Sequence, residues 1–161
     1  MVTGTQEQIL QFLLSKPEER LSIRQIARML GKSYTLTYNN IQVLLKKKIL
    51  ESRALPPAKM IQLSEQAPIK ILAHIERKRT EAFLEKHPWG KLYLNDILKA
   101  AKPFFIMLVF GSYAKGMQTK YSDLDILIIA PTKEDIAVLE QAAQQYTKVK
   151  KSIIVVDAQN F

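Results

Sequence analysis

The sequence has no cysteine and no apolar run long enough to cross a membrane. Without cysteine, the chain can form neither disulfides nor thiolate metal sites. Its apolar runs stay well below the roughly 20 residues that a membrane span requires. The first ten residues, MVTGTQEQIL, lack the charged and apolar regions of a signal peptide. We therefore expect a cytoplasmic protein without a membrane partner.

Length and charge indicate how many domains the chain can form and what kind of partner it could bind. Hydrophobic residues make up 47% of the 161 residues, which is enough for packed cores in one ordinary domain or two small ones. The net charge is +9, and residues 1–65 carry +5 of it, from ten basic and five acidic side chains. This balance fits an anionic partner, such as nucleic acid or a nucleotide. It fits a lysine-rich surface without such a partner equally well, so charge alone leaves both open.

The first 65 residues show helical spacing followed by two short β-type segments. Ser22 and Gln25 have the spacing of a capping box at a helix start. Gly31 suits the end of the same helix, because glycine adopts the left-handed conformation at little cost. Pro56 and Pro57 mark a turn between the two β-type segments. The expected elements are helices over 5–15, 23–30 and 34–47 and strands over 49–55 and 59–64.

This order of elements resembles a winged helix-turn-helix domain over residues 5–65. The resemblance is clearest in the segment SIRQIARMLGKSYTLTYNNIQVLLKKKILES. Many members of that superfamily have glycine where Lys48 stands. The polar face of the third helix could enter a DNA major groove, where amide side chains suit adenine edges. The same face also suits contacts with a protein. The candidate DNA contacts are Ser33, Tyr34, Thr35, Tyr38, Asn39 and Gln42.

The rest of the chain predicts a linker and a compact second domain. Residues 66–90 are expected to be a helical linker, whose mixed-charge helix over 67–87 is also a candidate homodimer interface. Residues 91–161 predict the order helix, strand, short helix, strand, helix, strand. The run FFIMLVF over 104–110 is typical of a strand buried on both faces. We therefore expect an α+β chain of two domains, the second a small α/β fold.

The chemistry-bearing pattern lies in FFIMLVFGSYAKGMQTKYSDLDILII. Its strand delivers Gly111 and Ser112 to the start of a short helix. Helix starts expose unpaired N–H groups and a partial positive charge, which suits a phosphate. Gly111 has no side chain, so its backbone can approach a phosphate closely. Ser112 adds a hydroxyl donor, and it is equally suited to capping the helix.

Asp123 and Asp125 follow on the next strand. Residues two apart on a strand share a face, so both carboxylates point the same way. Two such groups repel each other and are costly to desolvate, and a divalent cation removes that cost. Mg²⁺ prefers one or two carboxylates together with phosphates and water. A pair of metal ions could stabilise the attacking and leaving oxygens of a displacement. The alternatives are a solvated strand edge and a site that binds nucleotide without turnover.

The motif in which hydrophobic-Gly-Ser is followed by Asp-hydrophobic-Asp resembles the DNA polymerase β-type nucleotidyltransferase superfamily. Within that superfamily, the segment FGSYAKGMQTKYSDLDILI is most similar to the minimal nucleotidyltransferases of prokaryotes. Those commonly have arginine where Lys115 stands, and lysine keeps the charge but loses the planar fork. Lys115 is therefore a candidate nucleotide contact or a surface residue. The superfamily usually has a third carboxylate on a later strand, and the resemblance assigns that place to Asp157. The alternative is that Asp157 is only a polar residue that ends a strand. The expected fold is thus an N-terminal winged helix with a C-terminal, small mixed-sheet nucleotidyltransferase domain.

The function that this combination predicts is Mg²⁺-dependent transfer of a nucleoside monophosphate, AMP from ATP, to a hydroxyl. Asp123, Asp125 and Asp157 would hold two Mg²⁺ ions, while Gly111, Ser112 and Lys115 would hold the nucleotide. The resemblance implies acceptors such as a small protein toxin, an antibiotic or a nucleic acid end. An alternative is a DNA-binding transcriptional regulator whose nucleotidyltransferase domain only senses nucleotide. A third is an interaction module within a larger complex.

Overall fold

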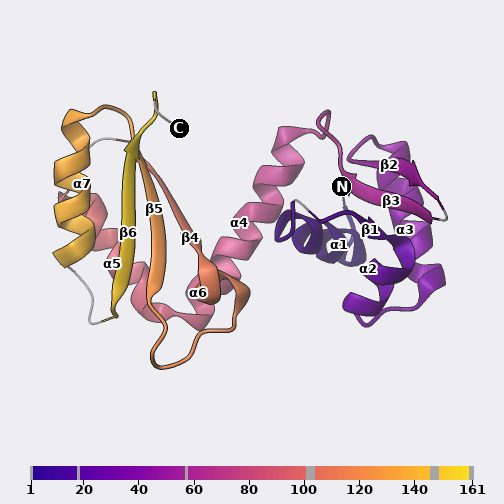
Figure 1. The fold of residues 1–161 in the computed structure, drawn as a ribbon, viewed down its shortest axis with the longest axis horizontal. Helices are drawn as coiled ribbons and strands as arrows, with labels where there is room; N and C mark the ends of the chain where they lie inside the picture. Colours follow the sequence, from indigo (N-terminus) through magenta and orange to yellow (C-terminus); the bar gives the residue numbers. More distant parts are fainter. Residues whose placement is uncertain (1, 18, 57, 101–103, 146–148, 160–161) are drawn as a thin grey trace. The chain divides into compact units, whose positions relative to one another are not determined.

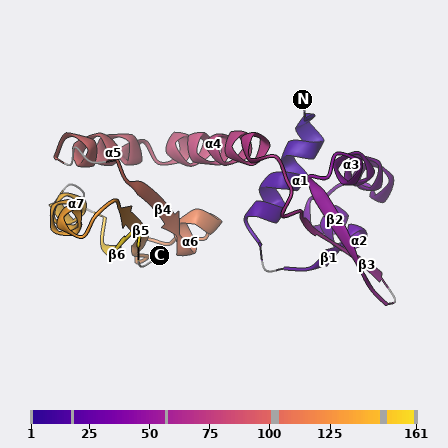
Figure 2. The same cartoon turned by 90° about the horizontal axis from the view of Figure 1, so that it is seen from above.

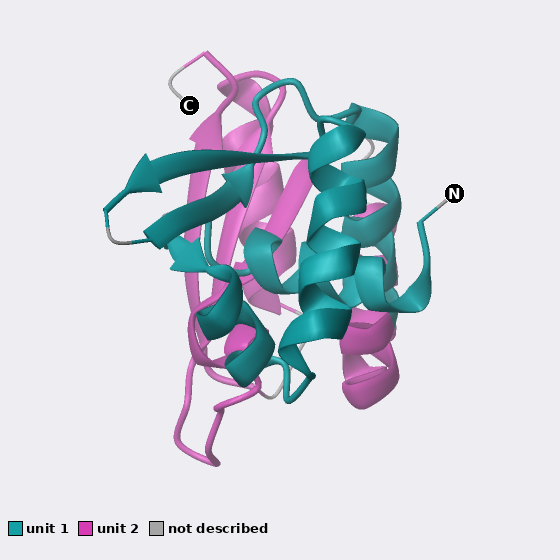
Figure 3. Cartoon of the chain, turned by 90° about the vertical axis from the view of Figure 1, so that its right-hand side faces the viewer, with its two compact units in different colours: residues 1–81 teal, residues 82–161 magenta. Residues whose placement is uncertain are grey.

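The chain forms two compact units, and a computed structural model describes each of them. The units are Met1–Glu81 and Ala82–Phe161, drawn in two colours in Figure 3. Each unit has its own hydrophobic core. The division falls inside one helix, α4, in the segment that the sequence predicts as a linker. The described residues are 2–17, 19–56, 58–100, 104–145 and 149–159.

The first unit consists of helices and a three-stranded antiparallel sheet (Figures 1 and 2). The strands lie in the order β1-β3-β2, and β2 and β3 form the hairpin that the sequence predicts. The short β1 was not predicted, because two residues give no periodic signal. Helix, strand, two helices and a hairpin form the topology of a winged helix. The elements are α1 Gly4–Leu14, β1 Leu21–Ser22, α2 Ile23–Met29, α3 Tyr34–Lys46, β2 Leu50–Leu55, β3 Ala58–Leu63 and α4 Ile69–Lys86.

Local signals in the sequence set the helix boundaries of this unit. Ser22 caps α2, and its hydroxyl accepts from the backbone of Gln25 while the Gln25 side chain accepts from the Ser22 N–H. This confirms the predicted capping box. Gly31 follows α2 with a φ of +61°, as its predicted place requires. On α3 the buried side chains are Thr37, Ile41 and Leu44, which pack toward the core.

Lys48 follows the end of α3 in a conformation that glycine adopts more easily. Its φ is +55°, and it alone among the described non-glycine residues has a positive φ. The N–H of Ile49 donates to the carbonyl of Leu44, and that of Lys48 donates to Leu45. These bonds form a left-handed C-terminal cap, in which L-residues with a side chain are strained. Glycine would adopt this conformation with less strain than Lys48 does.

The second unit is a three-stranded mixed sheet with helices on one face (Figures 1 and 2). The strand order is β4-β5-β6; β4 runs antiparallel to β5, and β6 runs parallel to it. One set of alternate side chains from β5 packs against α5 and α7, with Ile126 and Ile128 fully buried. The elements are α5 Pro88–Ala100, β4 Ile106–Phe110, α6 Gly111–Lys115, β5 Leu124–Ala130, α7 Glu134–Gln145 and β6 Lys151–Asp157.

The prediction that β4 is buried on both faces is wrong. Ile106, Leu108 and Phe110 are each more than 40% exposed, whereas Met107 and Val109 pack against the core. The reason is that β4 is an edge strand and both helices lie on the other face of the sheet. A continuous apolar run does not reveal how many layers cover it.

Tyr93 on α5 ties this helix to the end of α7. Its hydroxyl donates to the carbonyl of Ala143 at 2.7 Å, and burial raises the pKa of Tyr93 to about 12. The ammonium of Lys151 lies over the Tyr93 ring and donates to the carbonyls of Ala143 and Gln144. A cation is favourable at the negative end of a helix, although burial lowers the pKa of Lys151. Among the described residues, no helix has the length and apolarity to span a membrane.

Candidate functional site

Gly111 and Asp125 meet where β4 passes into α6. Phe110 and Asp125 are partners in the β4–β5 register, so the first residue of α6 lies beside the Asp125 side chain. A Cβ atom at Gly111 would lie only 2.0 Å from Oδ2 of Asp125 and 3.0 Å from its Cγ. Gly111 also has a φ of +66°, in the left-handed region. The left-handed backbone therefore favours glycine at this turn, and a side chain at position 111 would also displace the Asp125 carboxylate.

A hydrogen-bonded turn delivers Asp123 to the same end of β5. The N–H of Thr119 donates to Oγ of Ser122 at 2.9 Å, and the N–H of Ser122 donates back to the carbonyl of Thr119 at 3.1 Å. The chain then enters β5 at Leu124, whose N–H donates to the carbonyl of Lys150. Leu124 is buried toward the helices, so alternation places Asp123 and Asp125 on the opposite face. The alternation behind the prediction holds for Leu124 and Asp125, and Asp123 directly precedes the first residue of β5.

The two oxygens of Asp123 have different surroundings. Oδ2 accepts from the ammonium of Lys150 at 3.0 Å. Oδ1 is buried and has no hydrogen-bond partner among the described residues, and the same holds for Oε1 of Gln118 in the preceding loop. Buried acceptors normally have a donor or an ion as partner. Sequence reasoning missed both Lys150 and Gln118, because a lone lysine and a loop amide belong to no motif.

Two carboxylates and a partnerless oxygen fit one divalent cation. Mg²⁺ typically takes one or two protein carboxylates and completes its shell with phosphate oxygens and water. Within the described ranges, no group of three or more His, Cys, Asp or Glu side chains could hold a metal ion. Asp123 and Asp125 could therefore supply two carboxylates to such an ion, while the register of β6 does not place Asp157 beside them.

Asp157 lies at the other end of the sheet, which corrects its assignment to this site. It pairs with Ala130 at the last position of β5, while Asp125 pairs with Ser152. Ser152 and Asp157 are five positions apart on β6, which corresponds to about 16 Å. Asp157 is buried, and its Oδ1 accepts from the N–H of Gln159. Chain order could not reveal this, because the parallel register decides which part of β6 lies beside Asp125.

The remaining predicted nucleotide contacts lie on α6. Ser112 is half-buried inside the helix, and the N-cap is Phe110, which makes no side-chain cap, so Ser112 does not act as the helix cap. Lys115 is exposed in the last turn. Tyr113 packs edge-on against Trp89 and His87, with ring centres 6.0 and 5.6 Å away. This aromatic contact fixes α6 against the start of α5.

In the first unit, the candidate DNA contacts share one exposed surface of α3. The side chains of Tyr34 and Tyr38 stack with ring centres 5.9 Å apart, and both are about half exposed. Ser33 is engaged as the N-cap of α3, where its hydroxyl accepts from the N–H of Leu36. All six predicted residues are exposed: Ser33, Tyr34, Thr35, Tyr38, Asn39 and Gln42.

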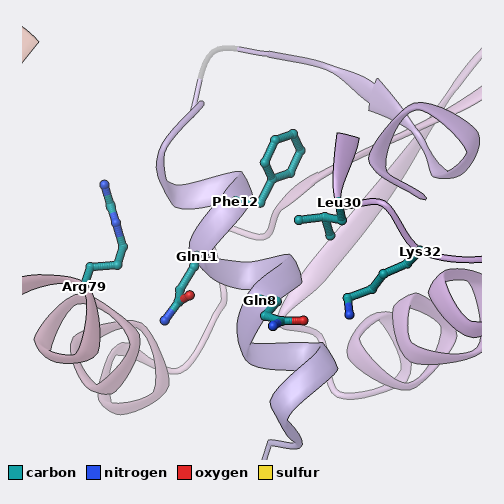
Figure 4. Close-up of a pocket in the computed structure, with 6 residues that line it drawn as sticks. All are labelled: Gln8, Gln11, Phe12, Leu30, Lys32 and Arg79. Carbon is teal, nitrogen blue, oxygen red and sulfur yellow. The ribbon is translucent and has the colours of Figure 1, made fainter. Parts of the chain in front are cut away.

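An open pocket of about 420 Å³ also belongs to the first unit. Figure 4 shows Gln8, Gln11 and Phe12 reaching it from α1, with Arg79 on α4. Leu30 and Lys32, which flank the turn after α2, complete its lining. None of the predicted nucleotide or metal residues lines this pocket.

A family model described as nucleotidyltransferase domain matches residues 94–159. This range contains all three strands of the second sheet together with α6 and α7. Residues 94–159 of the second unit therefore form a nucleotidyltransferase domain. No curated protein matches the sequence.

Several solved structures of winged-helix regulators are similar to the chain. The adhesin competence repressor AdcR from Streptococcus pyogenes is 22% identical with a TM-score of 0.47, over 56% of this chain and 65% of its own. The homodimeric winged helix-turn-helix DNA-binding domain of a possible ArsR-family regulator from Mycobacterium bovis is 20% identical with a TM-score of 0.41, over 49% and 70%. A ZitR variant from Lactococcus lactis in complex with DNA is 22% identical with a TM-score of 0.44, over 55% and 59%.

Proposed function

We propose that the second unit binds a nucleoside triphosphate, ATP, and transfers its nucleoside monophosphate to a hydroxyl of an acceptor. The observation that best supports this is the meeting of Gly111 and Asp125. It joins the turn after β4 to a face of β5 that also carries Asp123. Phosphate-binding backbone and cation-binding carboxylates are the two features that nucleotidyl transfer requires. The family match over residues 94–159 supports the same reaction class.

The roles follow from the chemistry of each group. Backbone at Gly111 and the hydroxyl of Ser112 hold the β- and γ-phosphates, and the exposed ammonium of Lys115 neutralises triphosphate charge. Asp123 and Asp125 hold Mg²⁺ together with the phosphates. When bound, the ion neutralises charge on the phosphate oxygens. Asp157 has no part in this proposal, because the β6 register places it at the far end of the sheet.

The reaction is an in-line displacement at the α-phosphorus. The acceptor hydroxyl releases its proton to solvent, and its oxygen forms a bond to the α-phosphorus. The bond from that phosphorus to the bridging oxygen breaks, and pyrophosphate leaves with the electron pair. The chain's own contribution is to orient the triphosphate between α6 and β5, since correct orientation alone removes a large part of the barrier. We propose a protein hydroxyl as acceptor, such as one on a small toxin.

Thermal unfolding with each of the four common triphosphates, with and without Mg²⁺, tests the nucleotide site. A ligand at about 100 times its Kd adds about 2.7 kcal/mol of stability. We expect a Mg²⁺-dependent shift that an Asp123→Ala, Asp125→Ala double variant loses. Incubation with α-labelled ATP and candidate acceptors then tests transfer. A chain that shows no shift with any nucleotide would contradict the proposal.

A second candidate function is a DNA-binding regulator whose nucleotidyltransferase domain senses nucleotide without turnover. Two observations favour it: within the described part of the chain no third carboxylate joins Asp123 and Asp125, and Lys150 is paired with Asp123. The exposed polar surface of α3 supports the DNA-binding part. Operator-sized DNA should then bind with an affinity that falls steeply as salt rises.

Variants of α3 separate specific binding from attraction by charge alone. Asn39→Ala removes an exposed amide suited to base edges, and a lost base contact costs about 1–3 kcal/mol. Gln66→Ala is the matched control, because Gln66 is an exposed amide in the turn before α4. Equal affinities of the two variants, measured by fluorescence anisotropy, would contradict DNA recognition by α3.

A further inference from the structure

The start of β6 determines what lies beside the candidate carboxylates. In the parallel register, Ser152 is the partner of Asp125, and Lys151 is the partner of Leu124. In-register residues on neighbouring strands share a face of the sheet. Leu124 and Lys151 therefore lie on the helix-covered face, while Asp125 and Ser152 lie on the open one. The position next to Asp125 thus carries an exposed hydroxyl and not a carboxylate.

The neighbouring residues Lys150 and Lys151 make contacts on opposite faces of the sheet. Lys151 points toward α7 and binds the carbonyls at the end of that helix. Lys150 points to the open face and pairs with Oδ2 of Asp123 at 3.0 Å. The Lys150 side chain is 81% exposed, so the pair is held weakly and its ammonium can leave at small cost. A positive charge at Asp123 is therefore already present in the nucleotide-free chain.

We propose that β6 limits this site to one divalent cation. Ser152 leaves the position beside Asp125 without a third carboxylate, and Lys150 supplies at Asp123 the positive charge that a second ion would bring. The inference rests on the proposed function, because it concerns the metal content of the same site. It also explains how two carboxylates can lie together in a chain whose described residues hold no three-carboxylate group.

Mn²⁺ binding to the full chain, measured by electron paramagnetic resonance with and without ATP, tests the proposal. We expect wild type to bind one Mn²⁺ in the presence of ATP. Ser152→Asp adds a hard oxygen ligand next to Asp125, and affinity rises with the number of charged ligands. It should tighten Mn²⁺ binding about tenfold and raise the stoichiometry with ATP to two.

Two further variants make the test specific. Ile154→Asp places a carboxylate on the same face of the same strand, two residues farther along, at a side chain that is 50% exposed. It should leave Mn²⁺ affinity unchanged. Lys150→Gln removes the competing ammonium without adding a ligand, so it should tighten Mn²⁺ binding without raising the stoichiometry. Thermal unfolding of each variant confirms that the fold is retained.

The proposal is overturned if wild type binds two Mn²⁺ ions with ATP, or if Ser152→Asp and Ile154→Asp have equal affinities. Its failure is distinguishable from failure of the proposed function. Transfer by a wild type that holds two ions would overturn the inference and support the function. A wild type that binds one Mn²⁺ with ATP, and gains a second in Ser152→Asp, but transfers nothing to any acceptor would support the inference and overturn the proposed transfer.

Discussion

The backbone of Gly111 lies so close to the Asp125 carboxylate that a side chain at position 111 would have to displace it. A Cβ there would lie 2.0 Å from Oδ2 of Asp125, and the residue has a φ of +66°. The glycine therefore places the carboxylate as much as it opens the backbone to a phosphate. The two halves of the motif, which are 14 positions apart in the sequence, form one structural unit.

Gly111→Ala should lower the free energy of unfolding by about 2–3 kcal/mol and weaken Mg²⁺–ATP binding. The change adds backbone strain and pushes the Asp125 carboxylate away. Gly116→Ala is the matched control, because Gly116 also has a φ of +66° but has no atom within 4 Å of an added Cβ. It should cost only about 1 kcal/mol of strain. Urea unfolding and ATP-dependent thermal shifts measure both effects. Equal losses in the two variants would show that Asp125 moves freely.

Asp125→Asn and Asp157→Asn should differ sharply in nucleotide binding. The first removes a charge from the candidate site, so the Mg²⁺-dependent thermal shift with ATP should disappear. The second removes a charge about 16 Å away along the sheet, so the shift should persist. Comparable loss in both variants would argue that Asp157 acts on the site after all.

Lys48→Gly should stabilise the first unit by about 0.5–1 kcal/mol. The substitution relieves the left-handed strain at a φ of +55°, and part of that gain is offset by the greater freedom of glycine in the unfolded chain. Lys46→Gly, two residues earlier inside α3, should instead destabilise by about 1 kcal/mol. Urea midpoints that move in the same direction for both variants would contradict the assigned cap.

Stability should fall at alkaline pH because of Tyr93. Its folded pKa of about 12 lies above the ordinary value of 10.0, so the folded state keeps a proton that the unfolded state releases. This contribution is fully present below pH 10 and is lost as pH rises toward 12. Tyr93→Phe removes the ionisable group and should flatten the stability profile over that window. It also removes one hydrogen bond to Ala143, which costs about 0.5–1.5 kcal/mol at neutral pH. If the stability of wild type and of Tyr93→Phe fell equally between pH 10 and 12, Tyr93 would not be the cause of the fall.

The sequence predicted those features that depend on nearby residues. The Ser22–Gln25 capping box, the glycine end of α2 and the shared face of Asp123 and Asp125 all follow from local rules. Features that depend on contacts between distant parts of the chain could not be predicted from the sequence. The place of Asp157 and the pairing of Lys150 with Asp123 both depend on the β5–β6 register, which no local pattern reveals. The exposure of β4 depends on which face the helices cover.

The exposed face of β4 has a consequence for how the protein behaves in concentrated solution. Ile106, Leu108 and Phe110 form an apolar row on a strand that, within the described residues, pairs on one side only. Natural sheets usually protect such edges with charge, proline or a bulge, because an open apolar edge invites another chain to add a strand. Self-association at high concentration should therefore begin at β4, beside Asp125, and nucleotide binding should weaken as the protein aggregates.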